Sequence, residues 1–234
     1  MTLFRININK ILIAALLVSA CTKDDQPATK LDDGKSTIIN DLAGDTRASI
    51  SDGVDGKEKR PFYTFLYSFK DKKQIWIRNQ ADSAQWLNTD KWDIAFTGNY
   101  NSDIYINNGT IIGSPGYKNS INNTAILFVD QPYNTVNTAP SDGEFNKSTI
   151  RMVGMADSKN THGWYAYNLT SHIMKAFPDK TYVLRLSDGK YAKLQILSAY
   201  KGNPPGVTDM YWPAPYLSFR FYVQQDGSKN LNTK

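Results

Sequence analysis

The chain has 234 residues and a formal net charge of +5 at pH 7, and no segment gathers that charge into a basic stripe. A mild, scattered positive charge gives little support to nucleic-acid binding. Two histidines and one cysteine leave little material for metal-cluster or nucleophilic chemistry, whereas fourteen tyrosines, ten phenylalanines and five tryptophans favour β-strands.

The first twenty residues have the three parts of a secretory signal peptide. Arg5 and Lys10 supply a positive beginning, residues 11–18 form an apolar core, and Ser19-Ala20 are the small residues that precede a cleavage point. An apolar run of this length is too short to cross a hydrocarbon layer of roughly 30 Å. We therefore expect residues 1–20 to be a cleaved signal and not a permanent transmembrane helix.

Cys21 follows this segment directly and is the single cysteine of the chain. The sequence VSAC at 18–21 resembles the bacterial lipobox, which implies that Cys21 is the lipid attachment site. An unpaired thiol in a secreted protein otherwise needs an explanation. Buried acyl chains, at about 0.8 kcal/mol per CH₂, would anchor the protein to a membrane. Lys23-Asp24-Asp25 resembles the tag that directs Bacteroidetes lipoproteins to the cell surface of the outer membrane; a solvated charge run in a linker is the alternative.

Residues 21–60 are polar, charged and poor in aromatic side chains. A segment of this kind buries too little apolar surface to fold alone. We expect a lipidated, largely disordered tether with one short ordered piece around Ile38-Ile39. The folded domain is expected to span residues 61–231.

From Pro61 onward, short apolar or aromatic runs alternate with Asn, Asp, Gly and Pro, which is the pattern of short strands and turns. The clearest unit is a hairpin in which Asp188-Gly189 supplies the positive φ angles of a tight turn. No helical stripe of comparable length is present. We predict an all-β, mainly antiparallel domain, either a sandwich or an open barrel. The expected strands, in chain order, are 62–69, 74–78, 92–97, 103–106, 124–129, 150–153, 164–168, 181–187, 190–200 and 216–224.

In the last two strands one face is expected to point inward and the other outward. Leu217, Phe219 and Phe221 alternate with Ser218 and Arg220, so we expect the apolar set inside and the polar set in solvent. The preceding strand alternates in the same way, with Lys193 and Gln195 on its polar face.

The segment from 164 to 196 resembles the HmuY-like haem-binding lipoproteins of Bacteroidetes. It contains WYAYN at 164–168 and TYVLRLSDGKYAKLQI at 181–196. KWDIAF at 91–96 and FRFYVQQDGS at 219–228 are similar to the family's N-terminal half and last strand. The resemblance implies an all-β fold, capture of haem outside the cell, and transfer of the haem to a TonB-dependent outer-membrane transporter.

Haem iron needs one or two axial donors, commonly imidazole or thioether, inside a largely apolar pocket. The resemblance implies one ligand shortly after the WYAYN segment, where His172 and Met174 lie. We expect these two side chains to be ligands of the haem iron. Each also has a simpler explanation, because methionines often fill gaps in a core and a histidine can form hydrogen bonds in a loop.

The resemblance implies a second ligand well upstream, but residues 130–147 contain neither His nor Met. The nearest donors are Met152 and Met155, which we therefore include as candidate haem contacts. Haem propionates would need cations, and Lys175, Arg185 and Lys193 are available.

The sequence has no nucleophile elbow, no HExxH and no phosphate-binding glycine loop, so we do not expect an enzyme. The alternative to haem capture is a surface glycan- or protein-binding module of the same fold without haem ligation. The aromatic–proline segment YWPAPY at 211–216 could serve such binding, although a rigid strand connection that packs its own rings explains it as well.

Overall fold

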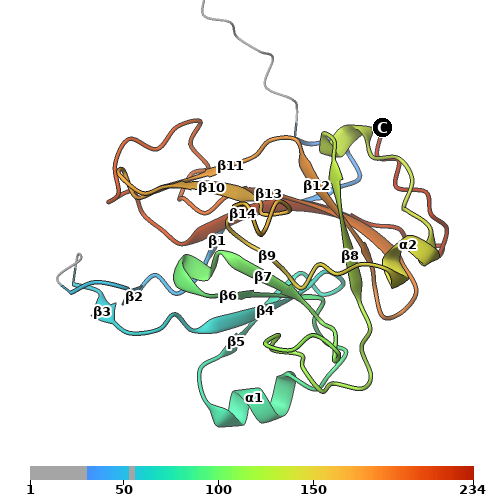
Figure 1. The fold of residues 1–234 in the computed structure, drawn as a ribbon, viewed down its shortest axis with the longest axis horizontal. Coiled ribbons are helices and arrows are strands. Elements are labelled where there is room, and N and C mark those ends of the chain that lie inside the picture. Colours follow the sequence, from blue (N-terminus) through green and yellow to red (C-terminus); the bar gives the residue numbers. More distant parts are fainter. Residues whose placement is uncertain (1–30, 53–55) are drawn as a thin grey trace, which may run out of the picture. The chain divides into compact units, whose positions relative to one another are not determined.

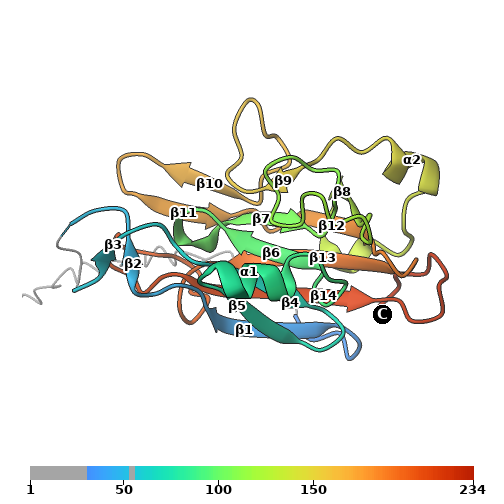
Figure 2. The same cartoon turned by 90° about the horizontal axis from the view of Figure 1, so that it is seen from below.

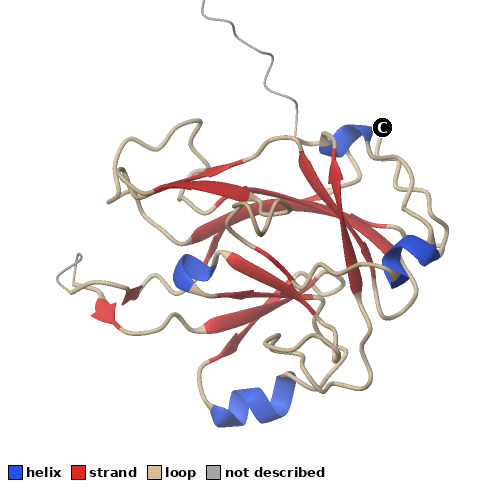
Figure 3. Cartoon of the chain, viewed as in Figure 1, coloured by secondary structure: helices blue, strands red, loops and turns tan. Residues whose placement is uncertain are grey.

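The computed structural model describes residues 31–52 and 56–234, and the folded unit spans Leu31–Lys234. Strands dominate it, and the helices are short and lie outside the sheets (Figure 3). The expected signal peptide and Cys21 lie outside the described residues. Within the described residues, no helix is long and apolar enough to span a membrane.

The first of two five-stranded sheets has the order β1-β14-β13-β12-β8, and all of its neighbouring strands are antiparallel (Figure 1). Its centre is the predicted hairpin of β12 and β13, whose turn contains Gly189 at φ +83°. The strands are β1 (Thr37–Ala43), β8 (Ala125–Asp130), β12 (Lys180–Arg185), β13 (Tyr191–Ser198) and β14 (Tyr216–Val223).

The second sheet has the order β5-β4-β6-β7-β9 and is also antiparallel throughout. The expected strand at 150–153 is shorter than predicted, because only Met152 and Val153 pair with β7. The strands are β4 (Thr64–Ser68), β5 (Lys73–Ile77), β6 (Ile94–Thr97), β7 (Asp103–Ile106) and β9 (Met152–Val153).

Two short strand pairs form separate two-stranded sheets. The parallel pair is β2 (Ala48–Ser49) with β3 (Glu58–Lys59), and an antiparallel hairpin is formed by β10 (Tyr165–Asn168) and β11 (Ile173–Ala176). The helices are α1 (Gln80–Trp86) and α2 (Asp142–Asn146), with 3₁₀ turns η1 (Asn99–Asn101) and η2 (Tyr133–Thr135). Side-chain caps support both short α-helices, from Asn79 for α1 and from Ser141 for α2.

The two sheets pack face to face: they lie apart in Figure 1 and overlap in the turned view of Figure 2. Aromatic side chains from both sheets fill the core between them. Phe65 and Phe96 of the second sheet stack with ring centroids 4.7 Å apart. Tyr67 meets Phe219 of the first sheet edge to face at 5.1 Å. Each fully buried side chain of this size stabilises the fold by about 1.5–3 kcal/mol. The predicted all-β antiparallel domain is confirmed, and it is a two-sheet sandwich.

The domain boundary expected at Pro61 is wrong. Strand β1 forms an edge of the first sheet, where Thr37 pairs with Phe221 and Ala43 with Tyr216. Backbone pairing holds this polar segment although few of its side chains reach the core. Arg60 adds an ion pair to the nearly buried Asp45. Residues 31–52 therefore belong to the folded unit.

The second face of β13 and β14 is covered and not in solvent, contrary to the sequence-based expectation. Arg220 is only 3% exposed and donates to the Gln195 side chain at 2.8 Å. Lys193 is fully buried, and its Nζ donates to Tyr133 O, Val136 O and Thr233 Oγ1 at 3.0–3.2 Å. The η2 region and the C-terminal segment form this cover. Burial lowers the pKa of Lys193 to about 8.

Candidate functional site

The β10–β11 hairpin is built by a local turn that the sequence encodes. The Asn168 side chain accepts the backbone N–H groups of Thr170 at 2.8 Å and Ser171 at 2.9 Å, which is an Asx-type turn. The His172 N–H then closes the turn on Asn168 O at 2.8 Å. His172 itself has φ +57°, the left-handed region that non-glycine residues seldom adopt.

The hairpin is fixed at two points, to the segment before β7 and to the segment after β13. The Trp164 ring is buried, and its Nε1–H donates to Ser102 O at 2.7 Å. On the other strand, the Met174 N–H donates to the Tyr200 hydroxyl at 2.9 Å. The tip is exposed, with Leu169 80% accessible to solvent. The hairpin therefore has an anchored base and an open end (Figure 1).

A cleft of about 380 Å³ runs beside β11, between the hairpin and the segment that follows β13. We call it the hairpin cleft. Its volume lies at the lower end of the 300–1,000 Å³ range of small-molecule sites. Apolar side chains form much of its wall. The lining residues used below are Trp164, Met174, Lys175, Tyr200, Pro204 and Val207.

Met174 lines the hairpin cleft, and His172 does not. Met174 is partly buried and packs against the main core. The exposed His172 lies in the turn, and its Nδ1 is 2.9 Å from the Tyr167 hydroxyl. Because Tyr167 is the direct cross-strand partner of Met174, the structure brings the two predicted donors together through this tyrosine.

Met152 and Met155 lie elsewhere. Met152 is in β9 and pairs with Tyr105 of the second sheet. Met155 forms an isolated parallel bridge with Tyr165, and its side chain is 38% exposed. Neither methionine lines the hairpin cleft. The structure therefore does not gather them with His172 and Met174 around one cavity.

Of the three cations considered for propionates, only Lys175 lines the hairpin cleft. Arg185 lies on the first sheet, 3.4 Å from an Asp142 carboxylate oxygen, and Lys193 is buried under the C-terminal segment. Lys175 is exposed on β11, on the face opposite Met174 along the strand.

Sequence reasoning, restricted to His and Met, missed the tyrosines around the hairpin. Tyr165 donates to or accepts from Ser102 Oγ at 3.0 Å, and Tyr200 supports Met174. Burial raises the pKa of Tyr100, Tyr165 and Tyr200, and each of these phenols also interacts electrostatically with Tyr167. The signal was the alternation in WYAYN, which puts Tyr165 and Tyr167 on one face.

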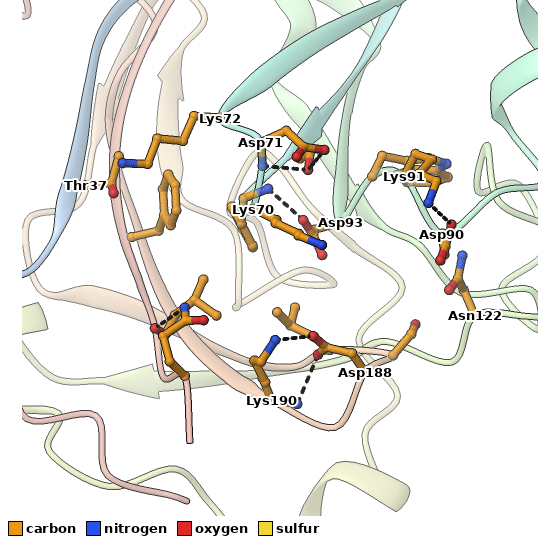
Figure 4. A pocket seen from close by; sticks show the side chains of 18 of the residues that line it. Thr37, Lys70, Asp71, Lys72, Asp90, Lys91, Asp93, Asn122, Asp188 and Lys190 are labelled. Atoms are coloured by element: carbon orange, nitrogen blue, oxygen red, sulfur yellow. Dashed lines mark hydrogen bonds and ion pairs between the residues drawn. The ribbon is translucent and has the colours of Figure 1, made fainter. Parts of the chain in front are cut away.

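A larger cleft of about 740 Å³, which we call the charged cleft, lies where the β4–β5 and β12–β13 turns approach each other. Figure 4 shows Asp93 in its middle, with Asp71 on one side and the Asp188–Lys190 ion pair on the other. Burial raises the pKa of Asp93 to about 6, although its carboxylate accepts the Phe69 N–H at 2.6 Å. Walls of mixed charge suit a flat apolar ligand poorly.

Among the residues that the structure describes, no group of three His, Cys, Asp or Glu side chains is placed to hold a metal ion.

A family model described as HmuY protein matches residues 63–212, which is more than half of the chain. Among solved structures, the chain is similar to the apo HmuY analogue of Tannerella forsythia, with 14% identity, a TM-score of 0.37, and coverage of 82% of this chain and 96% of that one. It is also similar to a Bacteroides vulgatus protein described as HmuY-like and haem-binding. The identity is 13% and the TM-score 0.37, with coverage of 80% of this chain and 90% of that one. For apo PinO from Porphyromonas gingivitis the identity is 15% and the TM-score 0.35, with coverage of 82% of this chain and 92% of that one. The search of curated proteins finds no match.

Proposed function

We propose, from the premise that the chain belongs to the HmuY family, that it binds haem at the hairpin cleft and acts as a haem carrier, not as an enzyme. The haem would be passed to a TonB-dependent transporter of the outer membrane. Cys21 would carry the lipid that holds the protein at the outer membrane, with the domain exposed on the cell surface. The proposal gives no role to Met152 or Met155, because neither lines the hairpin cleft.

The observation that carries this proposal is the position of Met174. Its thioether is one of the donors that haem iron accepts, and its side chain lines a cleft with apolar walls. Trp164, Pro204 and Val207 offer the apolar surface that a porphyrin ring would cover. Lys175 beside them could pair with a propionate. These residues fit the group.

The exposed tip of the hairpin supports release as well as capture. Ligand sites that must load and unload are drawn from elements with little buried surface. The β10–β11 pair has one anchored end and one exposed end, with Leu169 in solvent. A carrier that hands its ligand to a partner protein requires such an accessible side.

Titration of the purified domain with haemin tests the proposal. A saturable, sharp Soret band is expected for the wild-type protein, with weaker binding for Met174→Ala. The matched control is Leu169→Ala on the same hairpin, which removes an exposed apolar side chain and should leave the affinity unchanged. Met155→Ala tests the alternative donor.

Two other results of the titration would contradict all or part of the proposal. Broad absorbance without saturation, equal for wild-type protein and Met174→Ala, would reject haem binding and favour the glycan- or protein-binding module. Equal sharp bands for both proteins would retain haem binding but remove Met174 as a ligand.

A further inference from the structure

We propose that the hydroxyl of Tyr200 donates a hydrogen bond to a haem propionate in the hairpin cleft. The inference rests on the proposed function and adds a recognition residue to the same site. Tyr200, Met174 and Lys175 all line this cleft. Met174 and Lys175 belong to β11, whereas Tyr200 belongs to the segment that follows β13.

Local backbone contacts hold Tyr200 beside the cleft. Strand β13 ends at Ser198, where its register with β14 shifts. The Tyr200 N–H donates to Ser198 Oγ at 2.9 Å, and the Tyr200 carbonyl oxygen accepts the Asn203 N–H at 3.1 Å. Both backbone groups of the residue are therefore fixed. Tyr200 is only 6% exposed although it lines a cleft.

The hydroxyl of Tyr200 has used only part of its hydrogen-bonding capacity. Its oxygen accepts the Met174 N–H at 2.9 Å. A phenol can also donate one hydrogen bond, and within residues 31–52 and 56–234 no group accepts that proton. A nearly buried donor without an acceptor costs free energy, and such a group needs an explanation. An oxygen atom of a ligand in the cleft would be the missing acceptor.

The chemistry of this hydroxyl suits a carboxylate. Burial raises the pKa of Tyr200 above the usual value of a tyrosine, so the proton stays on the oxygen at neutral pH. The hydrogen bond from the Met174 N–H polarises the O–H group and strengthens it as a donor. Such donors form their strongest bonds with ionised oxygen atoms. Haem offers two ionised groups of this kind, its propionates.

The other lining residues divide the ligand in the same way. Lys175 supplies a positive charge for a carboxylate, and Trp164, Pro204 and Val207 supply apolar surface for the porphyrin ring. Met174 would contact the iron, which the propionates do not involve. Removal of the iron and removal of the propionate charge therefore test different residues.

Tyr200→Phe tests the inference because it removes one oxygen and keeps the ring. Three ligands are compared: haemin, haemin dimethyl ester, in which both carboxylates are blocked, and protoporphyrin IX, which keeps the carboxylates and has no iron. Quenching of tryptophan fluorescence measures all three affinities, because Trp164 lines the cleft. We expect the variant to bind haemin and protoporphyrin IX about tenfold more weakly, a loss of about 1.4 kcal/mol, and the dimethyl ester less than about twofold more weakly.

The matched control is Tyr182→Phe. Tyr182 is also buried, and its hydroxyl donates to His162 O at 2.6 Å, but it does not line the hairpin cleft. This variant loses a buried hydroxyl and should leave all three affinities unchanged. Melting temperatures of both variants check that each is folded.

The wild-type protein provides a second test that needs no variant. It should bind haemin at least about fivefold more tightly than the dimethyl ester, and equal affinities would overturn the inference. An equal loss for haemin and its dimethyl ester in Tyr200→Phe would also overturn it, because the hydroxyl would then act through Met174. A loss for haemin with none for protoporphyrin IX would place the acceptor on the iron and overturn it as well. A wild-type protein that binds none of the three ligands would overturn the proposed function too.

Discussion

Replacing Asp93 with Asn should stabilise the protein at neutral pH. The Asp93 carboxyl lies in the charged cleft, partly buried, and burial raises its pKa from 3.8 to about 6. The folded state therefore holds a proton more tightly than the unfolded state between these two values. Stability falls as the pH rises through this window, and the full cost remains above pH 6. Asn stays neutral and can still accept the Phe69 N–H.

The magnitude follows from the shift. About two pKa units at 1.36 kcal/mol each give an upper limit of about 3 kcal/mol, and screening by solvent at this partly exposed carboxyl reduces this to about 1–2 kcal/mol. Urea denaturation of wild-type protein and Asp93→Asn at pH 4, 5, 6 and 7.5 measures it, with Asp90→Asn as the control in the same cleft. The variant should gain stability relative to wild type as the pH rises. A variant that is less stable than wild type at pH 7.5, or a difference that does not vary with pH, would refute the reasoning.

Three other substitutions follow from the structure. Lys193→Met leaves two carbonyl oxygens and a hydroxyl without their donor and should cost about 1–3 kcal/mol of stability near pH 7. Because burial lowers the pKa of Lys193 to about 8, the wild-type protein should gain stability from this group as the pH rises from about 8 to 10.5. Urea midpoints across that range should show no such gain in the variant. Gly109→Ala would place a Cβ 1.9 Å from Asn119 O and should cost about 2–4 kcal/mol of stability. The control is Gly143→Ala, whose Cβ approaches nothing closer than 3.9 Å and which should be neutral or slightly stabilising. Equal melting temperatures for the two variants would contradict the packing described. Cys21→Ser should move the protein from the membrane fraction to the soluble fraction of cell extracts, and unchanged membrane association would reject the lipid anchor.

Much of the fold could be predicted because its signals are local. Asp188-Gly189 between two alternating runs fixes the β12–β13 hairpin, and the alternation of β14 identifies its core face. Strand β1 could not be found in the same way. Its partner β14 lies about 180 residues later in the chain, and it is held by backbone pairing that leaves little trace in side-chain composition.

The buried polar face of β13 and β14 was missed for a related reason. Alternation shows which side chains share a face, but it does not show whether a second layer covers that face. Lys193 and Arg220 have the sequence signature of exposed residues, yet the η2 region supplies acceptors for both, and Thr233 of the C-terminal segment supplies another for Lys193. Burial of these charges depends on contacts between distant segments.

The candidate site could be predicted in part. The family resemblance pointed to the region of His172 and Met174, and the structure places Met174 on the hairpin cleft. The resemblance could not reveal that His172 contacts Tyr167, because that contact depends on the turn geometry at Asn168. The roles of His172 and Met174 in haem binding stay proposals.

The most direct test of the account is the location of bound haem. Hydrogen-exchange mass spectrometry of the protein with and without haemin should show protection in residues 164–176 and 198–207, the two segments that border the hairpin cleft. The charged cleft, at residues 68–72 and 186–190, should show no change. Protection at the charged cleft, or none at the hairpin under conditions where haemin saturates the protein, would contradict the account.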